Sequence, residues 1–233
     1  MKCAKIICVW MGSKRSLSNN CLTSEIIDEV IDLETNLDKG YPTDTIFVIN
    51  KCGIPELDNY LDKFNNKKTH NGVIKIIQRS NIGLSFGAYL ETYHKLKKEY
   101  DYWFFCEDDV IIYKDNYIKM FIENLSEDTS FVALSPISEH IKPHCGGGCG
   151  LTSTYFMSKV YPDEELPSIL DKWGLCKGYD GGIWESEFTS KFKLANCKNI
   201  SPLASNWRFH SSQRNHASHN IQINYIYKVG KRI

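Results

Sequence analysis

The sequence predicts an α/β protein built on one mostly parallel sheet that is flanked by helices. Up to about residue 128, strand-like apolar segments alternate with segments of helical periodicity. The strand-like segments are apolar throughout, which is typical of strands buried on both faces of a parallel sheet. Apolar residues make up 42% of the 233 residues, which is enough to fill the core of such a fold.

Four apolar segments are expected to form the strands of the first half. Each is bounded by polar or turn-forming residues, as buried strands are. Sequential strands joined by helical crossovers form parallel pairs with right-handed connections. The predicted strands span residues 4–11, 45–50, 72–79 and 102–110.

The segments between these strands are expected to be helices. In the first of them, Thr23 or Ser24 can cap the N-terminus, and in the last Asp115 is the expected cap. A proline near the start of the second suits the first turn of a short helix. The predicted helices span residues 21–37, 54–66, 87–100 and 115–125.

The second half has a less regular pattern. Residues 130–136 are strand-like, and residues 143–159 are expected to form a glycine-rich turn followed by a strand or a short helix. No linker, repeat or low-complexity tract interrupts the chain, so one domain over residues 1–233 is expected.

Charge and cysteine content restrict the class of protein. Lys plus Arg and Asp plus Glu both number 28, so no basic excess indicates nucleic acid or a membrane surface. No apolar run approaches 18 residues, and the first residues are interpreted as a strand and not as a signal peptide. Nine cysteines, an odd number, favour reduced thiols and a cytoplasmic compartment.

Three consecutive acids end the fourth predicted strand, "YWFFCEDDV". Glu107 and Asp109 are expected to face one way and Asp108 the other, because alternate residues share a face of a strand. Adjacent carboxylates repel one another, and a hard cation such as Mg²⁺ or Mn²⁺ would relieve that repulsion. The alternative is that the acids begin a solvated loop.

Two segments in this order, "RSNIGLSFGAYLETYHKL" and "YDYWFFCEDDV", resemble the nucleotide-sugar half of GT-A fold glycosyltransferases of the family 2 type. Asn81 and Gly83 match an Asn-x-Gly loop of that family, and the three acids match its DxD motif. Glu107 stands where the family usually has Asp. The resemblance covers roughly the first 135 residues. It implies a Rossmann-like GT-A sheet, with residues 1–135 binding the nucleotide sugar and residues 136–233 on the acceptor side.

The resemblance implies that Asp109 coordinates the metal that bridges the donor diphosphate. Asp108 or Glu107 would contact the ribose or sugar of the donor, or reach the metal through water. Near the end of the chain, His210 after "NWRF" matches a histidine that some GT-A enzymes place on the metal.

Further donor contacts are implied at the ends of the first and third strands. Arg79 and Asn81 are placed to reach the base or a phosphate, with a surface arginine as the alternative for Arg79. Trp10 and Arg15 belong to "VWMGSKR", which ends the first strand, where the family has its base contacts.

The glycine-rich segment "PHCGGGCG" admits two interpretations. His140, His144, Cys145 and Cys149 could form a zinc site, but their spacing matches no standard pattern. The favoured interpretation is a turn whose backbone approaches a ligand, since glycine permits close approach. The family has a glycine-containing segment at this point on the acceptor side.

The base that would deprotonate the acceptor hydroxyl is expected among three acids. Asp180 lies where the family has an acidic residue at a helix N-terminus, and Glu185 and Glu187 are its rivals. The alternative for Asp180 is a helix N-cap without a catalytic role.

The expected function is therefore metal-dependent glycosyl transfer, inverting as in most of family 2. The donor would be a nucleoside diphosphate sugar, with a UDP-sugar favoured over a GDP-sugar. The cofactor would be Mn²⁺ or Mg²⁺, and the acceptor would be a hydroxyl of a glycan or glycoprotein. One alternative is a nucleotidyltransferase that makes nucleotide sugars, although the single glycine of "WMGSKRSLSNN" is few for its phosphate loop. The other is a non-catalytic carbohydrate- or nucleotide-binding module.

Overall fold

The computed structural model describes most of the first two thirds of the chain and parts of the last third. The described residues are 1–11, 23–108, 110–112, 114–134, 137–138, 143–162, 187–196 and 226–228. The structural statements below concern these residues.

A seven-stranded sheet forms the centre of the molecule, in the order β10-β6-β9-β4-β1-β2-β3. Four of its six strand pairs are parallel, and only β9 runs antiparallel to both of its neighbours. The predicted α/β class with a mostly parallel sheet is confirmed. The strands are β1 (Cys3–Val9), β2 (Thr43–Asn50), β3 (Ile74–Arg79), β4 (Tyr102–Glu107), β6 (Phe131–Ala133), β9 (Gly150–Ser153) and β10 (Leu194–Asn196).

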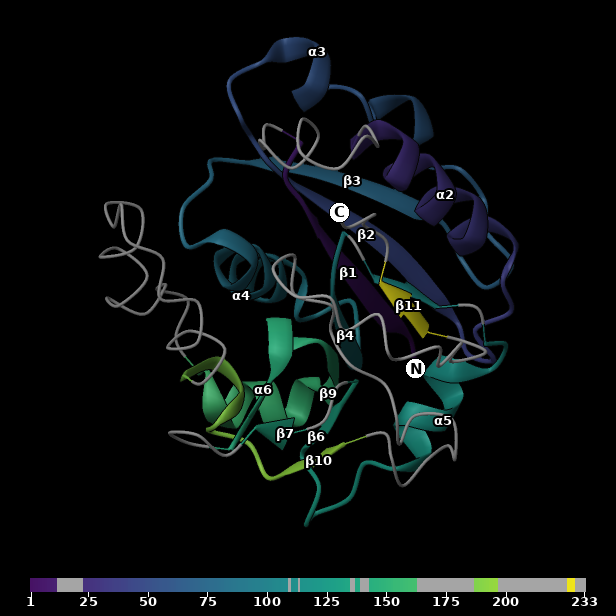
Figure 1. Ribbon diagram of the computed structural model, residues 1–233. Helices are drawn as coiled ribbons and strands as arrows, with labels where there is room; N and C mark the ends of the chain where they lie inside the picture. Colours follow the sequence, from purple (N-terminus) through teal and green to yellow (C-terminus); the bar gives the residue numbers. More distant parts are fainter. Residues whose placement is uncertain are drawn as a thin grey trace, which may run out of the picture.

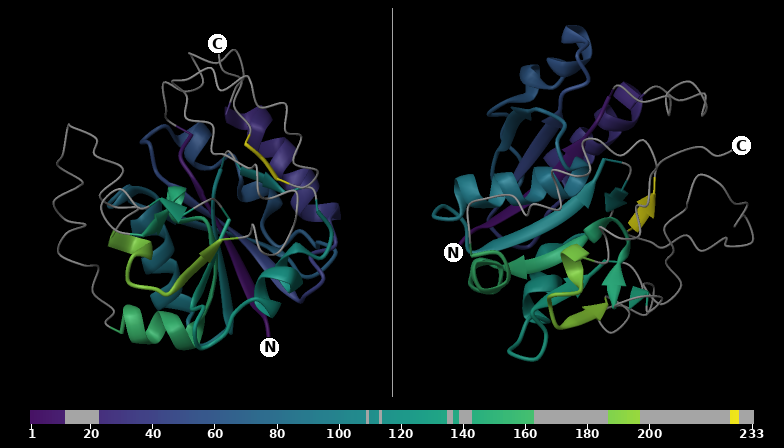
Figure 2. Two further views of the ribbon diagram at one scale, coloured as in Figure 1. Left: turned by 60° about the horizontal axis from the view of Figure 1, so that its bottom comes forward. Right: turned by 90° about the vertical axis from the view of Figure 1, so that its left-hand side faces the viewer.

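Two short antiparallel ribbons lie outside the central sheet. β5 (Val110–Ile112) pairs with β11 (Ile226–Lys228), and β7 (Ile137–Ser138) pairs with β8 (His144–Cys145). Figure 2 shows β11, in yellow, beside the sheet and not within it. The first ribbon brings residues from near the end of the chain next to the segment that follows β4.

Helices cover both faces of the sheet (Figure 1). α2 and α5 pack on one face, whereas α4 and α6 pack on the other. The helical segments are α2 (Thr23–Asn36), α3 (Pro55–Asp58), α4 (Leu84–Leu96), α5 (Tyr117–Glu123), α6 (Thr154–Val160) and the 3₁₀ turns η1 (Asp62–Phe64) and η2 (Gly146–Gly148). In the described part of the chain, no helix is long and apolar enough to cross a membrane.

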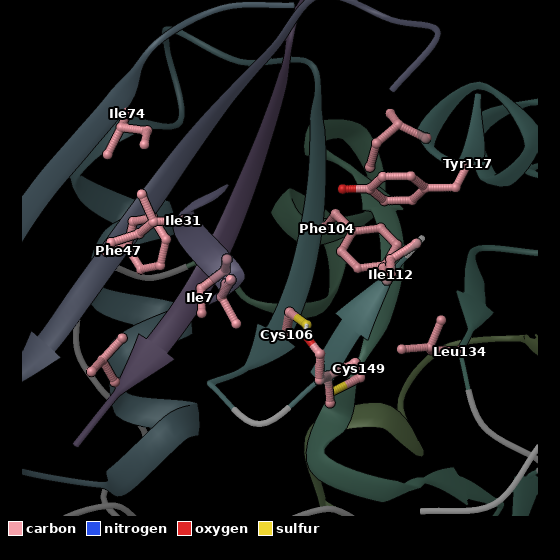
Figure 3. Packing of buried hydrophobic residues seen from close by; sticks show 14 of the residues in the cluster. Ile7, Ile31, Phe47, Ile74, Phe104, Cys106, Ile112, Tyr117, Leu134 and Cys149 are labelled. Atoms are coloured by element: carbon pink, nitrogen blue, oxygen red, sulfur yellow. Dashed lines mark hydrogen bonds between the residues drawn. The ribbon is translucent and has the colours of Figure 1, made fainter. Parts of the chain in front are cut away.

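Alternation along β4 divides the core into two layers. Phe104 and Cys106 face α2 and α5, and Figure 3 shows Phe104 beside Tyr117 of α5. Trp103 and Phe105 face α4 and α6. All four side chains are fully buried, so the aromatic run that precedes the three acids contributes to both layers.

Three predicted elements differ from the structure. The predicted fourth strand, 102–110, is divided: β4 ends at Glu107, the chain turns at Asp108, and β5 begins at Val110. The predicted helix 54–66 is divided into α3 and η1. The N-cap of α5 is Asn116 in a left-handed conformation, whereas the carboxylate of Asp115 accepts from the backbone N–H of Asp38.

Candidate functional site

The carboxyl ends of four parallel strands meet at one edge of the sheet. β1 connects to β2 and β3 on one side, whereas β4 lies on its other side, so the strand order reverses between β1 and β4. In open α/β sheets such a reversal leaves a crevice outside the strand ends, and ligands bind there. Trp10 follows β1, and Glu107 ends β4, so both flank the reversal.

The two described acids of the cluster lie in different surroundings. Asp108 is 8% exposed, and its Oδ2 accepts a hydrogen bond of 3.2 Å from the backbone N–H of Trp10. This contact joins the ends of β1 and β4. Glu107 is half-buried, and its carboxylate lies so close to Gly147 that a methyl group there would come within 2.9 Å of its Cδ and Oε2. Trp10 is 42% exposed.

Cys8 lies between these acids and α4. Burial raises the pKa of its thiol well above the usual value, and the negative charges of Asp108 and Glu107 raise it further. The side chain is therefore a neutral thiol at physiological pH.

Arg79 ends β3, and all three nitrogens of its guanidinium donate to the protein. Nε donates to Glu91 at 2.7 Å, Nη1 to the side chain of Asn50 at 2.6 Å and Nη2 to the carbonyl of Ile82 at 2.9 Å. The side chain is buried among these partners. Arg79 thus holds the edge together, and its predicted contact with a base or phosphate stays a prediction.

Asn50 is a buried residue of this edge that sequence reasoning missed. Its amide donates to Sγ of Cys8 and to the carbonyl of Leu84, both at 3.2 Å, and accepts from Arg79. It thereby joins the ends of β1, β2 and β3 to the start of α4. The signal in the sequence was a single polar residue ending the apolar run "TIFVIN".

Asn81 and Gly83 form the loop that enters α4. Gly83 has a φ of +74°, a left-handed conformation that favours glycine, and it is the N-cap of the helix. The side-chain Oδ1 of Asn81 is buried and accepts no hydrogen bond from the described residues. An acceptor without a partner is costly, so this oxygen is suited to a ligand N–H or O–H.

The glycine-rich segment packs on the end of β4, and its approach to a ligand stays a prediction. The hydroxyl of Tyr89 in α4 donates to the carbonyl of Gly147 at 3.3 Å. The φ of Gly147 is +62°, and Gly148 has no room for a side chain against Phe86 and Phe188. The backbone at Gly147 therefore lies close to the Glu107 carboxylate.

Glu187 is the one candidate base among the described residues. The next residue, Phe188, is firmly held. Its ring packs against the rings of Phe105 and Phe86, with centroids 5.4 and 5.3 Å away, and the hydroxyl of Tyr161 donates to the carbonyl of Phe188 at 2.9 Å. These contacts fix the backbone of Glu187 near the end of β4. The other candidates Arg15, Asp109, Asp180, Glu185 and His210 lie outside the described residues, as does His140 of the possible zinc site.

The donor groups at this edge bear on whether it can hold a metal ion. Within the described ranges, no three His, Cys, Asp or Glu side chains gather as a metal site, His144, Cys145 and Cys149 included. Glu107 and Asp108 supply oxygen donors of the kind that Mg²⁺ and Mn²⁺ prefer, and Asp109 follows directly. A magnesium-like ion that completes its shell with water and phosphate fits this donor set.

Comparison with known proteins gives one solved structure of interest. No protein family and no curated protein matches the chain. A cytidylyltransferase from Leptospira borgpetersenii serovar Hardjo-bovis (strain JB197) shares 16% identity over 84% of this chain and 75% of its own, with a TM-score of 0.45. At this identity and TM-score the likeness assigns neither a family nor an activity.

Proposed function

We propose that the chain is a transferase that binds a nucleotide-activated sugar and a divalent cation outside the carboxyl ends of β1 and β4. The observation that carries this proposal is the position of Glu107 and Asp108 at the reversal of strand order, next to the exposed residue Trp10, whose backbone N–H bonds to Asp108. Carboxylates at this point suit a cation that bridges to diphosphate oxygens. An exposed indole suits stacking on a nucleobase.

The reaction we favour is glycosyl transfer. The order of β3, the Asn81–Gly83 loop, α4 and β4 agrees with the resemblance to GT-A glycosyltransferases. The cation, held by Glu107 and Asp109, would stabilise the charge that develops on the leaving diphosphate. The pairing of β11 with β5 supports a return of the chain towards this edge, which His210 needs to act as a further ligand.

Among the three acids proposed as the base, Glu187 is the one whose position supports that role. Its backbone is held next to Phe188, whose ring packs against Gly148 of the glycine-rich loop. A carboxylate there would take the proton of the acceptor hydroxyl, which contributes about 10²–10⁴-fold to the rate of such reactions. Asp180 and Glu185 remain its rivals.

Nucleotidyl transfer is the second candidate, because the same edge and cation would also serve a nucleoside triphosphate and a sugar phosphate. The two reactions release different products. Glycosyl transfer and donor hydrolysis release a nucleoside diphosphate, whereas nucleotidyl transfer releases pyrophosphate.

The test incubates the purified protein with UDP-sugars and Mn²⁺, and separately with nucleoside triphosphates and sugar 1-phosphates. We expect release of UDP in the first mixture and its loss in EDTA. Glu107→Gln should lower the rate by about 10²-fold or more, the usual worth of a metal ligand's charge. Pyrophosphate in the second mixture alone would establish nucleotidyl transfer, and binding without either product would identify a binding module.

A further inference from the structure

A polar cavity of about 530 Å³ lies at the opposite edge of the sheet from the carboxylates. Three separate segments form it: the loop that enters β2, the turn before β3 and the start of α5. Figure 1 shows α5 beside the N-terminus, where β1 begins. β2 runs eight residues from this cavity to Asn50, a distance of about 26 Å. The lining includes Asp38, Tyr41, His70, Asn71, Asn116 and Lys119.

Hydrogen bonds between the three segments hold the wall of this cavity in place. Oδ1 of Asp38 accepts from the backbone N–H of Gly40 at 2.8 Å and from the amide of Asn71 at 3.0 Å. The amide oxygen of Asn71 accepts from the backbone N–H of Lys39 at 2.6 Å. The backbone N–H of Asn116 donates to the carbonyl of Asp38 at 2.7 Å. The cavity is therefore preformed, which lowers the entropic cost of binding.

Asn116 supplies an unused amide to this cavity. Its φ is +62°, in the left-handed region, and Gly40 packs against its Cα with no room for a Cβ. The side chain does not cap α5, and it forms no hydrogen bond with any residue in the described ranges. It presents one acceptor oxygen and two donor hydrogens.

The chemistry of the lining selects the class of ligand. Hydrogen bonds from Asn71 and Gly40 lower the pKa of Asp38, which is thus an ionised acceptor at neutral pH. The amide of Asn116 and the ammonium of Lys119 add donors, and the half-buried ring of Tyr41 adds an apolar surface. Vicinal hydroxyl groups both donate and accept, so they match this mixed set. An anion would be repelled by Asp38.

We propose that this cavity binds a carbohydrate unit, a mono- or disaccharide, through Asp38, Asn116 and Lys119. The cavity is a shallow, open one, so it suits a small polar ligand that stays partly exposed to solvent. The proposal does not depend on the function of the opposite edge, because no residue is shared between the two.

The test is a titration of the ¹⁵N-labelled protein with methyl α-D-glucopyranoside, methyl α-D-mannopyranoside and N-acetylglucosamine, followed by NMR. At least one glycoside should shift the amide signals of Asn71, Asn116 and Lys119, with a dissociation constant of about 1 mM. Asn116→Gly should weaken this binding by about tenfold, the worth of one hydrogen-bonded pair. Glycine also accepts the left-handed φ, so this variant keeps its fold.

Asn66→Gly is the matched control, because Asn66 also has a positive φ, of 65°, and lies away from the cavity. It should leave the titration unchanged. Three results would each overturn the proposal: no shift with any of the glycosides, equal binding by wild type and Asn116→Gly, or inorganic phosphate shifting the same amides instead.

Discussion

The guanidinium of Arg79 and the amide of Asn50 illustrate how single residues hold the binding edge. Each bonds to partners on different elements: Arg79 to α4 and the loop before it, Asn50 to β1 and α4. The three nitrogens of the planar guanidinium reach three acceptors that lie in different directions, and the single nitrogen of a lysine cannot span them. The geometry at the ends of β1, β2 and β3 therefore depends on arginine and not merely on positive charge.

We expect Arg79→Lys to lower the free energy of unfolding by about 2–3 kcal/mol, because it leaves buried acceptors unpaired. Glu91→Gln should cost less than about 1 kcal/mol, since the carboxylate of Glu91 is 46% exposed and its ion pair is screened. Urea unfolding measures both. Equal losses would mean that the ion pair, and not the contacts with Asn50 and Ile82, holds the edge.

The glycine-rich turn is the element that positions the Glu107 carboxylate. A side chain at Gly147 would meet the end of the flexible Glu107 side chain, which can move aside. Gly53 is a useful comparison: its φ is +85°, and nothing lies within 4 Å of a Cβ built there. The two glycines share a left-handed backbone but differ in what surrounds them.

We expect Gly147→Ala and Gly53→Ala each to lower the free energy of unfolding by about 1–2 kcal/mol, the cost of a left-handed alanine. Only Gly147→Ala should weaken the Mn²⁺-dependent binding of UDP, because it displaces Glu107. Calorimetric titration of both variants provides the comparison. A similar loss of UDP binding in both variants would show that the glycine-rich turn does not position Glu107 for binding.

Element prediction succeeded where a single signal dominated. The apolar runs around Ile6, Phe47 and Phe104 are buried strands, because continuous burial of this kind has few alternatives. The end of β4 could not be placed, since the partner of β5 lies far away at residues 226–228 and no local pattern contains it. The cap of α5 was assigned to Asp115 by propensity, whereas a tertiary contact with Asp38 engages that carboxylate.

Prediction of the candidate site likewise succeeded where one signal in the sequence dominated and failed where contacts between distant segments decide the structure. Trp10, Glu107 and Asp108 were predicted at the strand ends and lie there, because parallel strands bring their carboxyl ends to one edge. Asn50 was missed, since its role depends on partners from three other elements. Nothing in the sequence indicated the cavity near Asn116, whose walls come from three distant segments.

At the scale of the whole molecule, a buried charge cluster joins α2 to the sheet. The carboxylate of Glu34 binds the ammonium groups of Lys5 and Lys39 and accepts from the hydroxyl of Thr45 at 2.9 Å. Burial raises the pKa of Glu34, but the two lysines lower it by more, and the net result is a pKa of about 2. Burial in turn lowers the pKa of Lys39.

The sign of the pH dependence follows from this lowered pKa. The contribution of Glu34 to stability is complete above its ordinary value of 4.5 and is lost as the pH falls towards 2. We expect a decrease of about 3 kcal/mol in the free energy of unfolding over this interval. Urea unfolding at a series of pH values measures it.

Glu34→Gln should remove this dependence and destabilise the protein by about 3–5 kcal/mol at neutral pH, since two buried cations lose their partner. If that variant does not fold, Lys39→Met offers a second comparison, with a smaller decrease over the same interval. An unchanged decrease in Lys39→Met would assign the acid sensitivity to other carboxylates.

The ribbon of β5 and β11 also imposes an order on events during synthesis. β5 leaves the ribosome more than one hundred residues before its partner β11. At ordinary elongation rates this interval lasts about 10 s. Most of the central sheet can assemble on the nascent chain in that time. The strand next to the acidic turn, by contrast, cannot pair with β11 until residues 226–228 have been synthesised, so this edge of the candidate site is completed later than most of the central sheet.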